Sequence, residues 1–495
     1  MNAIQEILNT LNNDEFKSLE KFIKKRNKRK DVQNISLLNY YKNDDINKIK
    51  NQKNNAHYAV RKRFYESLIQ FLANTTFEQN NSETNEALKY LIVSQYFLKN
   101  NLYKEAYQCL SKAENQALKL EQFNLLNEIY QIHIQYAYLN NFHNLNEYLV
   151  KYENNIILQQ KEAKLNIAYS LLRKELDEIH RSKKIIDLNF LIKSTMKSVG
   201  IDLDSVLTYK SLNQILFIAN EYASIHHNYS LIDEFVNKSY QFLESKKESV
   251  KNHLYDHIQI VYFIVNYHFR NLKFRESLFF LEEMEKLMNE KKGIYQKTFE
   301  LRKQLLKALN FHFSGKTEQA IDLIEKLIKS VSKTAKIEDL NELKLTLTMI
   351  LGQKENKSAV KYLAQLNHSD AWYEKKMGML WTIRKNMLEI LIHTQNENIE
   401  LALARISSFK RRYKKYLEEV KEKDVYNFAL LIEKNLLKPE IINDKTYKIS
   451  VQKLIENNQN KDPFILSFLA WLDAKIYKKQ VYENTLIFIN KNINN

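Results

Sequence analysis

The chain contains one short run, Gly315-Lys316-Thr317, whose residue types suit phosphate binding. A phosphate-binding loop of the Walker A kind also needs a glycine five residues earlier and a strand before it. Asn310 occupies that earlier position, and an apolar pattern with helical spacing precedes the run. We therefore predict that these residues form a turn between two helices and bind no nucleotide.

Histidines occur at two places where a chemical role has to be considered. His253 and His257 are four residues apart, so they share a helix face and have a spacing that metal ligands use. No His-Glu-x-x-His pattern accompanies them, and ordinary interface or surface histidines can have the same spacing. His226 and His227 fall where a predicted helix ends, where a cation interacts favourably with the last carbonyl groups. We predict no metal site, and a capping role for the second pair.

Cys109 is the one cysteine of the chain, which excludes an internal disulfide bond and a cysteine-cluster zinc site. Its neighbours Ala106, Leu110 and Ala113 are small or apolar, so we predict a small core residue. The acidic side chains are scattered, and no nucleophile, base and oxyanion hole can be assembled from the pattern. The sequence predicts a protein that is not an enzyme, with no catalytic residue, cofactor or metal.

Basic side chains gather near the N-terminus. The formal net charge is +17, and residues 16–63 hold 15 Lys and Arg against four acidic residues. Such asymmetry is typical of an electrostatic contact surface, although an A+T-rich coding sequence also yields abundant lysine. Three interpretations of these cations stay open: a solvated face without function, a contact surface for nucleic acid, and a contact surface for an acidic protein. The candidate contact residues are Lys24, Lys25, Arg26, Lys28, Arg29, Lys30, Arg61, Lys62 and Arg63.

A second basic stretch lies at residues 409–416, where cations are mixed with aromatic rings. This mixture suits nucleic acid, because cations neutralise phosphates and rings stack on bases. The rings of Phe409, Tyr413 and Tyr416 recur at helical spacing, however, which favours rings in the core and cations in solvent. The weaker candidate contact residues are Lys410, Arg411, Arg412, Lys414 and Lys415.

The elements that position these residues are expected to be helices. The chain has 495 residues, too many for one compact core, but only five Gly and two Pro. Sheets and glycine-rich loops need more turn residues than this, whereas long helices with short turns do not. Residues 305–313 and 318–329 each carry an apolar stripe at helical spacing, on either side of a short turn. One such hairpin cannot bury its outer face alone, so we expect neighbours of the same kind.

Similar helix pairs follow one another from residue 85 to residue 420. The predicted turns within pairs recur about every 40 residues, near residues 101, 141, 183, 228, 271, 315, 353 and 396. The other predicted helices of this part cover residues 85–99, 104–118, 123–139, 145–159, 163–181, 185–199, 211–226, 231–244, 253–269, 274–288, 339–351, 358–366, 371–394 and 400–420. We therefore predict an all-α fold, an α-solenoid of antiparallel helix hairpins.

The two ends of the chain depart from this pattern. Short apolar stripes predict a small helical module at residues 1–73, with helices near 4–11, 16–23, 35–41 and 58–72. A polar linker is expected at residues 74–84. The end of the chain, residues 421–495, is predicted to be an irregular helical cap with helices at 425–437, 447–457, 464–478 and 481–493. Asp462-Pro463 has the residue types of a helix start.

Two of the turns carry a more specific pattern. Phe311-x-x-Ser314-Gly315-x-x-x-x-Ala320 and Phe97-x-x-x-Asn101-x-x-x-x-Ala106 resemble the first-helix end, turn and second-helix alanine of tetratricopeptide repeats. The period is longer than the ~34 residues of that repeat, and most units lack its Trp and its Leu-Gly pair. The resemblance to tetratricopeptide-like proteins implies a concave groove that binds peptides or protein surfaces without catalysis.

We expect the protein to be located in the cytoplasm. No stretch approaches about 18 consecutive apolar residues, and residues 1–11 lack the features of a signal peptide, so we expect no membrane insertion. The expected function is that of a scaffold or adaptor that binds a protein partner along its groove. The alternative is a nucleic-acid-associated protein, linked to transcription or the ribosome, that contacts phosphates through the basic N-terminal module.

Overall fold

The computed structural model describes residues 3–8, 11, 13–26, 32–42, 55–79, 83–139, 144–182, 186–202, 208–246, 252–331, 336–420, 422–458 and 462–493. Every regular element within these ranges is a helix, which confirms the all-α prediction for the described chain. The helices fall into two compact units, formed by the described residues up to 156 and by those from 157 on. Among the described residues, no helix has the length and apolar character needed to cross a membrane.

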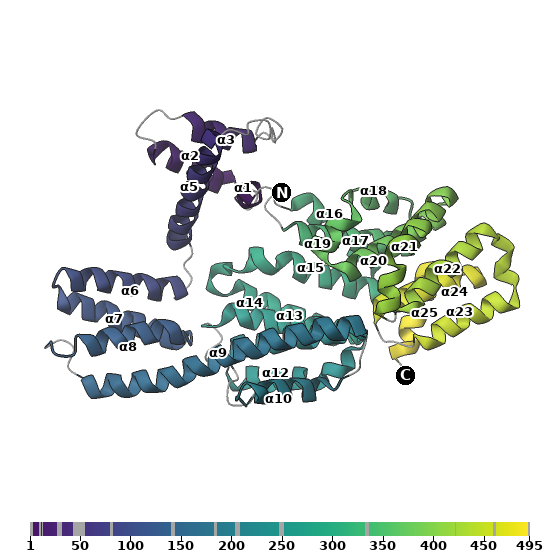
Figure 1. Ribbon diagram of the computed structural model, residues 1–495. Coiled ribbons are helices and arrows are strands. Elements are labelled where there is room, and N and C mark those ends of the chain that lie inside the picture. The colour runs from purple at the N-terminus through teal and green to yellow at the C-terminus, as the bar shows by residue number, and fades with distance from the viewer. Residues whose placement is uncertain are drawn as a thin grey trace. The chain divides into compact units, whose positions relative to one another are not determined.

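The described residues near the N-terminus form the four predicted helices around a small apolar core (Figure 1). They are α1 (Ala3–Leu8), α2 (Asn13–Arg26), α3 (Val32–Lys42) and α5 (Asn55–Gln79). Leu19, Leu38, Phe64 and Leu68 have no exposed surface, so α2, α3 and α5 meet at the centre of this core. α5 continues to Gln79, well into the predicted linker, because residues 74–79 contain neither glycine nor proline.

The rest of the first unit follows in chain order. It consists of α6 (Glu83–Lys99), α7 (Tyr103–Lys119), α8 (Phe123–Gln135) and the beginning of α9. α6 and α7 form the first predicted pair, and the fully buried Ala106 and Ala113 allow their backbones to approach closely. Cys109 is only half-buried, so its predicted core position is wrong. The buried stripe of α7 follows residues 106, 110, 113 and 117, which leaves Cys109 at the edge of that stripe.

Helix α9 is one continuous helix of 38 residues, Leu145–Ser182. The sequence pattern predicted two helices here, at 145–159 and 163–181, and that prediction is wrong. Residues 160–162 are Gln-Lys-Glu, which are all good helix formers. Their polarity suggested a turn, but polar side chains end a helix only when they also disfavour helical backbone or cap it.

The second unit continues with adjacent helix pairs. Its helices up to residue 419 are α10 (Leu188–Ser198), α11 (Tyr209–Ile225), α12 (Asp233–Ser245), α13 (Leu254–Arg270), α14 (Phe274–Asn289), α15 (Gln296–Phe313), α16 (Thr317–Ser330), α17 (Ile337–Gln353), α18 (Ala359–Leu363), α19 (Asp370–Met377), α20 (Met379–Gln395) and α21 (Ile399–Glu419), with short 3-10 helices η2 (Tyr229–Ile232) and η4 (Glu290–Gly293). Figure 1 shows α13, α14 and α15 as successive layers. The first helices also contact one another along the series α11, α13, α15, α17 and α20.

The turns within these pairs share one backbone geometry. One residue at each turn has a left-handed backbone conformation, at His227, Leu272, Gly315, Glu355 and Glu397, about 40 to 45 residues apart. The next residue donates its N–H to a carbonyl five residues back, over 2.8 to 3.0 Å. This is the Schellman ending of a helix, which satisfies carbonyl groups that the helix leaves unpaired. Only one of these five positions is a glycine. The chain therefore forms its turns with few glycines, because other residues adopt the left-handed conformation at most of them.

Residues 371–394 were predicted to form one helix, and that prediction is wrong. Gly378 separates α19 from α20 with φ +91° and ψ +161°. Side chains with a Cβ rarely adopt this backbone conformation, so glycine is what permits the break. The sequence did not reveal this break, because a lone glycine is also tolerated inside helices.

The C-terminal helices lie close to where the sequence pattern placed them. They are α22 (Lys423–Leu437), the 3-10 helix η5 (Pro439–Asn443), α23 (Lys445–Asn457), α24 (Pro463–Tyr477) and α25 (Val481–Ile493). Asp462 caps α24 by accepting a hydrogen bond from the Phe464 N–H over 2.9 Å, and Pro463 is the first helical residue. The predicted helix start is therefore confirmed.

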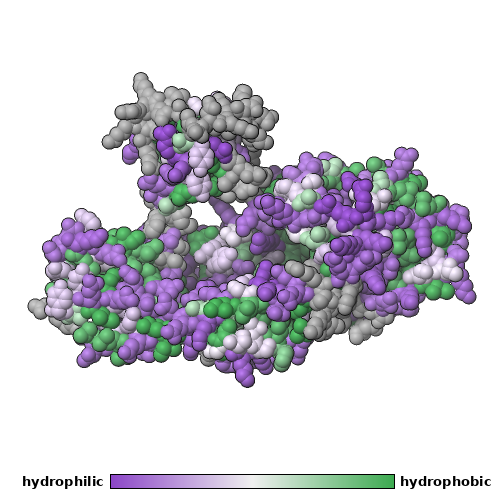
Figure 2. Space-filling model, in the orientation of Figure 1, coloured by the Kyte–Doolittle hydropathy of each residue, from purple (hydrophilic) through white to green (hydrophobic). Residues whose placement is uncertain are grey.

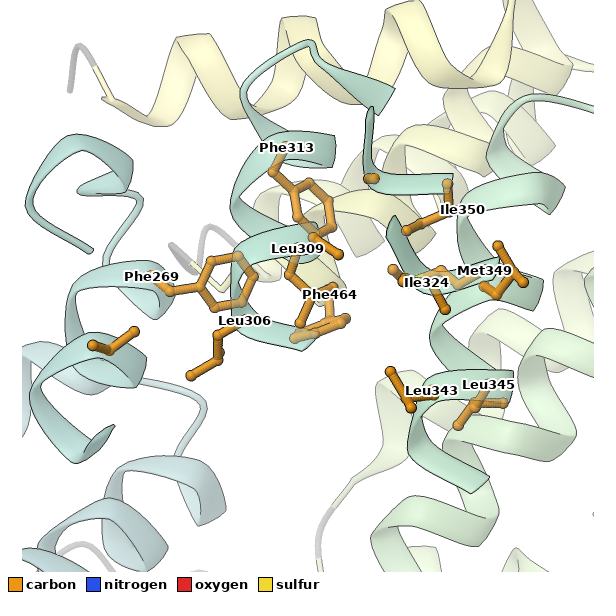
Figure 3. Close-up of a cluster of buried hydrophobic side chains, with 14 of the residues drawn as sticks. Phe269, Leu306, Leu309, Phe313, Ile324, Leu343, Leu345, Met349, Ile350 and Phe464 are labelled. Atoms are coloured by element: carbon orange, nitrogen blue, oxygen red, sulfur yellow. The ribbon is translucent and has the colours of Figure 1, made fainter. Parts of the chain in front are cut away.

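Helix α24 connects two apolar cores of the second unit. Phe464 belongs to the core of α13, α15 and α17, while Leu469 and Leu472 belong to the core of α20 to α23. Figure 3 shows Phe464 beside Leu309, and its ring contacts the rings of Phe269 and Phe313, which also contact each other. Ten of the fifteen residues of α24 are buried. The last helix pair thus packs against helices that precede it by more than a hundred residues.

We expect the substitution Phe464→Ala to destabilise the second unit by about 3 to 5 kcal/mol, because it leaves a cavity between the two cores. Phe464 is 8% exposed, whereas Leu437 is 68% exposed and provides the control. Leu437→Ala should change the free energy of unfolding by less than about 0.5 kcal/mol. Urea unfolding followed by circular dichroism measures both, and equal effects of the two substitutions would contradict this account of α24.

Candidate functional site

The predicted N-terminal contact residues lie only partly within the described chain. Lys24 and Lys25 are exposed near the end of α2, and Lys24 forms an ion pair with Glu20 over 2.6 Å. Arg26 is the last residue of α2. Three of the predicted residues lie outside the described ranges: Lys28, Arg29 and Lys30.

On α5, Lys62 and Arg63 are exposed and Arg61 is half-exposed. The Phe22 ring of α2 packs against the Phe71 ring of α5, with 5.7 Å between their centroids, so the end of α2 lies beside Phe71. Arg61 and Phe71 are ten residues apart on α5, which corresponds to about 15 Å along the helix.

The outward face of α5 combines cations with rings. Tyr58, Lys62 and Tyr65 are spaced four and three residues apart, so they lie on one side of the helix. The two rings are 74% and 39% exposed, while Val60 and Phe64 are buried on the opposite side. The sequence analysis singled out the charge of this helix and missed the rings. The positions of Tyr58 and Tyr65 on the helix side away from the apolar stripe were the signal in the sequence that indicates exposed rings.

The weaker candidate residues on α21 are largely engaged with acidic side chains. Arg412 donates two hydrogen bonds to Glu374, over 2.7 and 2.8 Å, and Lys410 does the same to Glu433. The longer ion pairs are Lys414 with Glu418 at 3.9 Å and Lys415 with Glu419 at 3.8 Å. Arg411 is exposed.

The rings of the same stretch point inward. Phe409 and Tyr413 are each 1% exposed, as their helical spacing predicted. The Tyr413 hydroxyl donates a hydrogen bond to Glu374 over 3.0 Å. These rings are therefore held in the core and do not present a face to bases.

A half-open cavity of about 340 Å³ lies within the second unit, between the ends of α11 and α13 and the helices α20 to α24. We call it the Arg270 cavity. Its polar lining residues are Ser224, His227, Arg270, Arg384, Glu422, Asp424, Asn458 and Asp462. The remaining lining is mostly apolar, with Trp381, Phe428, Phe464 and Phe468 as its aromatic part. Its volume is at the lower end of the range that small-ligand sites occupy, about 300 to 1,000 Å³.

One wall of the Arg270 cavity is built on the last residue of α13. Arg270 donates a hydrogen bond from Nη1 to the Asp462 carboxylate over 2.5 Å, and its guanidinium lies over the Phe464 ring at 4.5 Å from the centroid. Burial disfavours the charge of Arg270, but the Asp462 carboxylate outweighs burial and holds the guanidinium pKa above its ordinary value. Asp462 also caps α24, so one carboxylate fixes both the helix start and the arginine.

A second arginine approaches Phe464 from α20. Arg384 donates a hydrogen bond from Nη2 to Glu342 over 2.5 Å, and Trp381 donates its indole N–H to the same carboxylate. The Arg384 guanidinium lies 5.4 Å from the centroid of the Phe464 ring. Two cations from helices more than a hundred residues apart thus meet at one ring, where each contributes a cation–π contact.

Carboxylates also line the Arg270 cavity. His227 lies 3.4 Å from Glu422, measured from Nε2 to Oε1. Asp424 accepts a hydrogen bond from the Asn458 side chain over 2.8 Å. The lining therefore contains acceptor groups as well as guanidinium groups.

The sequence analysis did not find the Arg270 cavity. It singled out His227 as a capping residue and Asp462 as a helix cap, which are local roles that neighbouring residues reveal. Arg270 and Asp462 are 192 residues apart, so their pairing leaves no signal in either local pattern. Only the docking of α24 against α13 brings them together.

The other chemistry-bearing residues of the sequence have structural roles. Gly315 is at φ +86° in the predicted turn, and Thr317 begins α16. His312 accepts a hydrogen bond from the Thr317 hydroxyl at Nδ1, over 2.8 Å, and donates one from Nε2 to Gln353 over 3.0 Å. In the described ranges, no cluster of three or more His, Cys, Asp or Glu side chains is placed to hold a metal ion.

Comparison with known proteins provides no family assignment, since no family model, no curated protein and no solved structure matches the chain.

The buried histidines make stability depend on pH. Burial lowers the pKa of His312 to about 4, from 6.5 in an unfolded chain, so between these values only the unfolded state binds the proton. Stability is therefore complete above pH 6.5 and falls as the pH drops towards 4. Each such histidine contributes up to about 1.4 kcal/mol per pH unit to this slope.

The substitution His312→Gln removes one titrating group from this interval, so the free energy of unfolding should fall less steeply with acid than in the unchanged chain. Unfolding by urea at several pH values between 6.5 and 4 measures the two slopes. Because His133, His257 and His268 also have pKa values lowered to about 4 by burial, a residual slope is expected. Identical slopes in the two proteins would contradict a neutral His312.

Proposed function

We propose that this chain is a non-enzymatic helical-repeat scaffold or adaptor of the cytoplasm that binds a protein partner. The observation that supports it is the recurrence of helix pairs with the same left-handed turn, at residues 227, 272, 315, 355 and 397. The first helices of successive pairs contact each other, as the units of a repeat protein do when they share one core. We interpret this arrangement as a tetratricopeptide-like α-solenoid, a fold that offers an extended surface to partners.

The chain itself covers part of the surface on which a groove was expected. Phe464 of α24 packs against Phe269 and Phe313, and the Tyr482 hydroxyl of α25 donates a hydrogen bond to the His312 carbonyl over 2.7 Å. These contacts involve α13 and α15, the first helices of their pairs. We therefore propose that a partner of the second unit binds on surfaces that α24 and α25 leave open.

Exposed apolar side chains are available in the first unit as well. Ile92, Val93 and Tyr96 lie together on the outward side of α6, away from the buried Ala87 and Leu91. Over α6 to α8, Figure 2 shows hydrophobic and hydrophilic residues interspersed on the viewed face. A few apolar anchors within a polar surrounding are typical of protein-binding surfaces.

The proposal is tested by recovering the full chain with its bound proteins from native cells, with and without nuclease. We expect the same protein to be recovered in both conditions, and a complex to form again from the two purified proteins. Replacing Ile92 and Tyr96 with Ser should weaken that complex at least tenfold if α6 provides anchors, a loss of about 1.4 kcal/mol or more. Leu437→Ser, at an exposed position of α22, serves as the control. Recovery that disappears with nuclease would contradict the scaffold function.

A nucleic-acid-associated function is the second candidate, and the outward face of α5 favours it. Tyr58 and Tyr65 are exposed beside Lys62, which places rings for stacking next to a cation for phosphate. Lys62 and Arg61 have no ion-pair partner among the described residues. On α21, by contrast, acidic neighbours neutralise most of the cations. The N-terminal module is therefore the better of the two basic surfaces for such a partner.

A salt titration with a fluorescent single-stranded oligonucleotide tests this second candidate. Each phosphate contact contributes about 0.7 to the slope of log K against log salt concentration. Replacing Arg61, Lys62 and Arg63 with Gln should lower the slope by up to about 2 and weaken binding. The control variant replaces Lys414 and Lys415 with Gln and should leave the slope unchanged. Absence of binding at low salt by the unchanged chain would exclude this function.

A further inference from the structure

The Arg270 cavity contains hydrogen-bond donors that the protein does not use. Arg270 and Arg384 each donate one hydrogen bond, although a guanidinium group carries five N–H donors. Both side chains line the cavity and keep part of their surface exposed, 21% for Arg270 and 25% for Arg384. Guanidinium N–H groups without a protein acceptor take partners from water or from a ligand. A ligand with acceptor oxygens would provide such partners.

The same cavity also has unused acceptors and a wide apolar surface. Asp424 accepts one hydrogen bond from Asn458, and a carboxylate has room for about four. Trp381, Phe428 and Phe468 also line the cavity. An occupant that matches this lining combines an apolar body with both hydrogen-bond acceptors and donors.

The balance of charge argues against a simple anion. Two guanidinium groups line the cavity, but so do three carboxylates, those of Glu422, Asp424 and Asp462. A free carboxylate or phosphate would meet these acids at close range, where like charges repel strongly because little water screens them. A peptide segment is electrically neutral along its backbone and offers C=O acceptors and N–H donors next to an apolar side chain.

We propose that the Arg270 cavity is a peptide-binding site that receives one aromatic side chain of a protein partner. The ring lies among Trp381, Phe428 and Phe468, the peptide carbonyls accept from Arg270 and Arg384, and the peptide N–H groups donate towards Asp424 and Glu422. This proposal rests on the scaffold function, for which it supplies the binding site. Aromatic anchors in desolvated pockets contribute much of the affinity of many protein complexes.

The test uses the purified full chain and three small probes in ligand-detected NMR. N-acetyl-phenylalanine methylamide carries the ring and both amide groups, N-acetyl-alanine methylamide lacks the ring, and 3-phenylpropionate replaces the amides with a carboxylate. For the sixteen non-hydrogen atoms of the first probe, typical ligand efficiency predicts a dissociation constant of about 0.1 to 1 mM. We expect the first probe to bind at least tenfold more tightly than either of the others.

Matched variants locate the binding. Leu380 lines the cavity and is half-buried at the start of α20, so Leu380→Trp fills the space and should weaken binding of the first probe at least tenfold. Leu437→Trp adds the same ring at an exposed site and should change nothing. Unfolding curves check that both variants fold. A second variant, Asp424→Ala, removes an acceptor without filling the cavity and should weaken the amide probe more than 3-phenylpropionate.

The possible outcomes separate this proposal from the scaffold function. Tighter binding of 3-phenylpropionate than of the amide would identify a site for a small anion and overturn the peptide assignment. No binding of the first probe at about 10 mM, well above the expected dissociation constant, would also overturn it. If a reconstituted protein complex nevertheless forms and is unaffected by Leu380→Trp, the scaffold function stands and the cavity is not its binding site. If the first probe binds but no protein partner is recovered from cells, the cavity is a binding site and the scaffold function is contradicted.

Discussion

Helix α24 has too much apolar surface to sit at the end of a stack, and the second unit is arranged so that this surface is buried. Phe464 fills the core of α13, α15 and α17, while Leu469 and Leu472 fill the core of α20 to α23. Burying side chains of this size contributes about 1.5 to 3 kcal/mol each. The helix therefore joins two groups of helix pairs, which would otherwise contact only their neighbours along the chain. The Arg270 cavity lies beside this junction. The docked Phe464 ring contacts the guanidinium groups of both Arg270 and Arg384, which line the cavity.

The same constraint decides which surfaces remain for a partner. A simple stack leaves the faces of its first helices open, and here α24 and α25 occupy those of α13 and α15. The polar groups at the junction are partly satisfied, since Asp462 both caps α24 and binds Arg270. Removing one partner of such a buried ion pair strongly destabilises a protein, because the other charge stays buried without compensation. The docking of α24 is therefore specific as well as strong. The Arg270 cavity, whose two guanidinium groups have further N–H donors, is then the natural place to seek a ligand.

Local patterns revealed most of the helices. Apolar residues at helical spacing located the pair around Gly315, and the Asp462-Pro463 start was correct because a cap and its proline are adjacent in sequence. The failures have local causes too. Gln160-Lys161-Glu162 looked like a turn but consists of helix formers, so α9 is continuous. Gly378 looked tolerable inside a helix, yet its backbone angles end α19. Side-chain polarity and backbone preference are different signals, and at these two places they disagree.

The sequence by itself determined that the chain is helical, where most helices begin and end, and that cations are concentrated near the N-terminus. These properties depend on residues within a few positions of one another, whose spacing the sequence shows directly. The tertiary structure decided that Arg270 meets Asp462, and that Arg384 and Arg270 share the Phe464 ring. Contacts across a hundred or more residues depend on how helices dock, and docking follows from the summed burial of many side chains rather than from any local pattern.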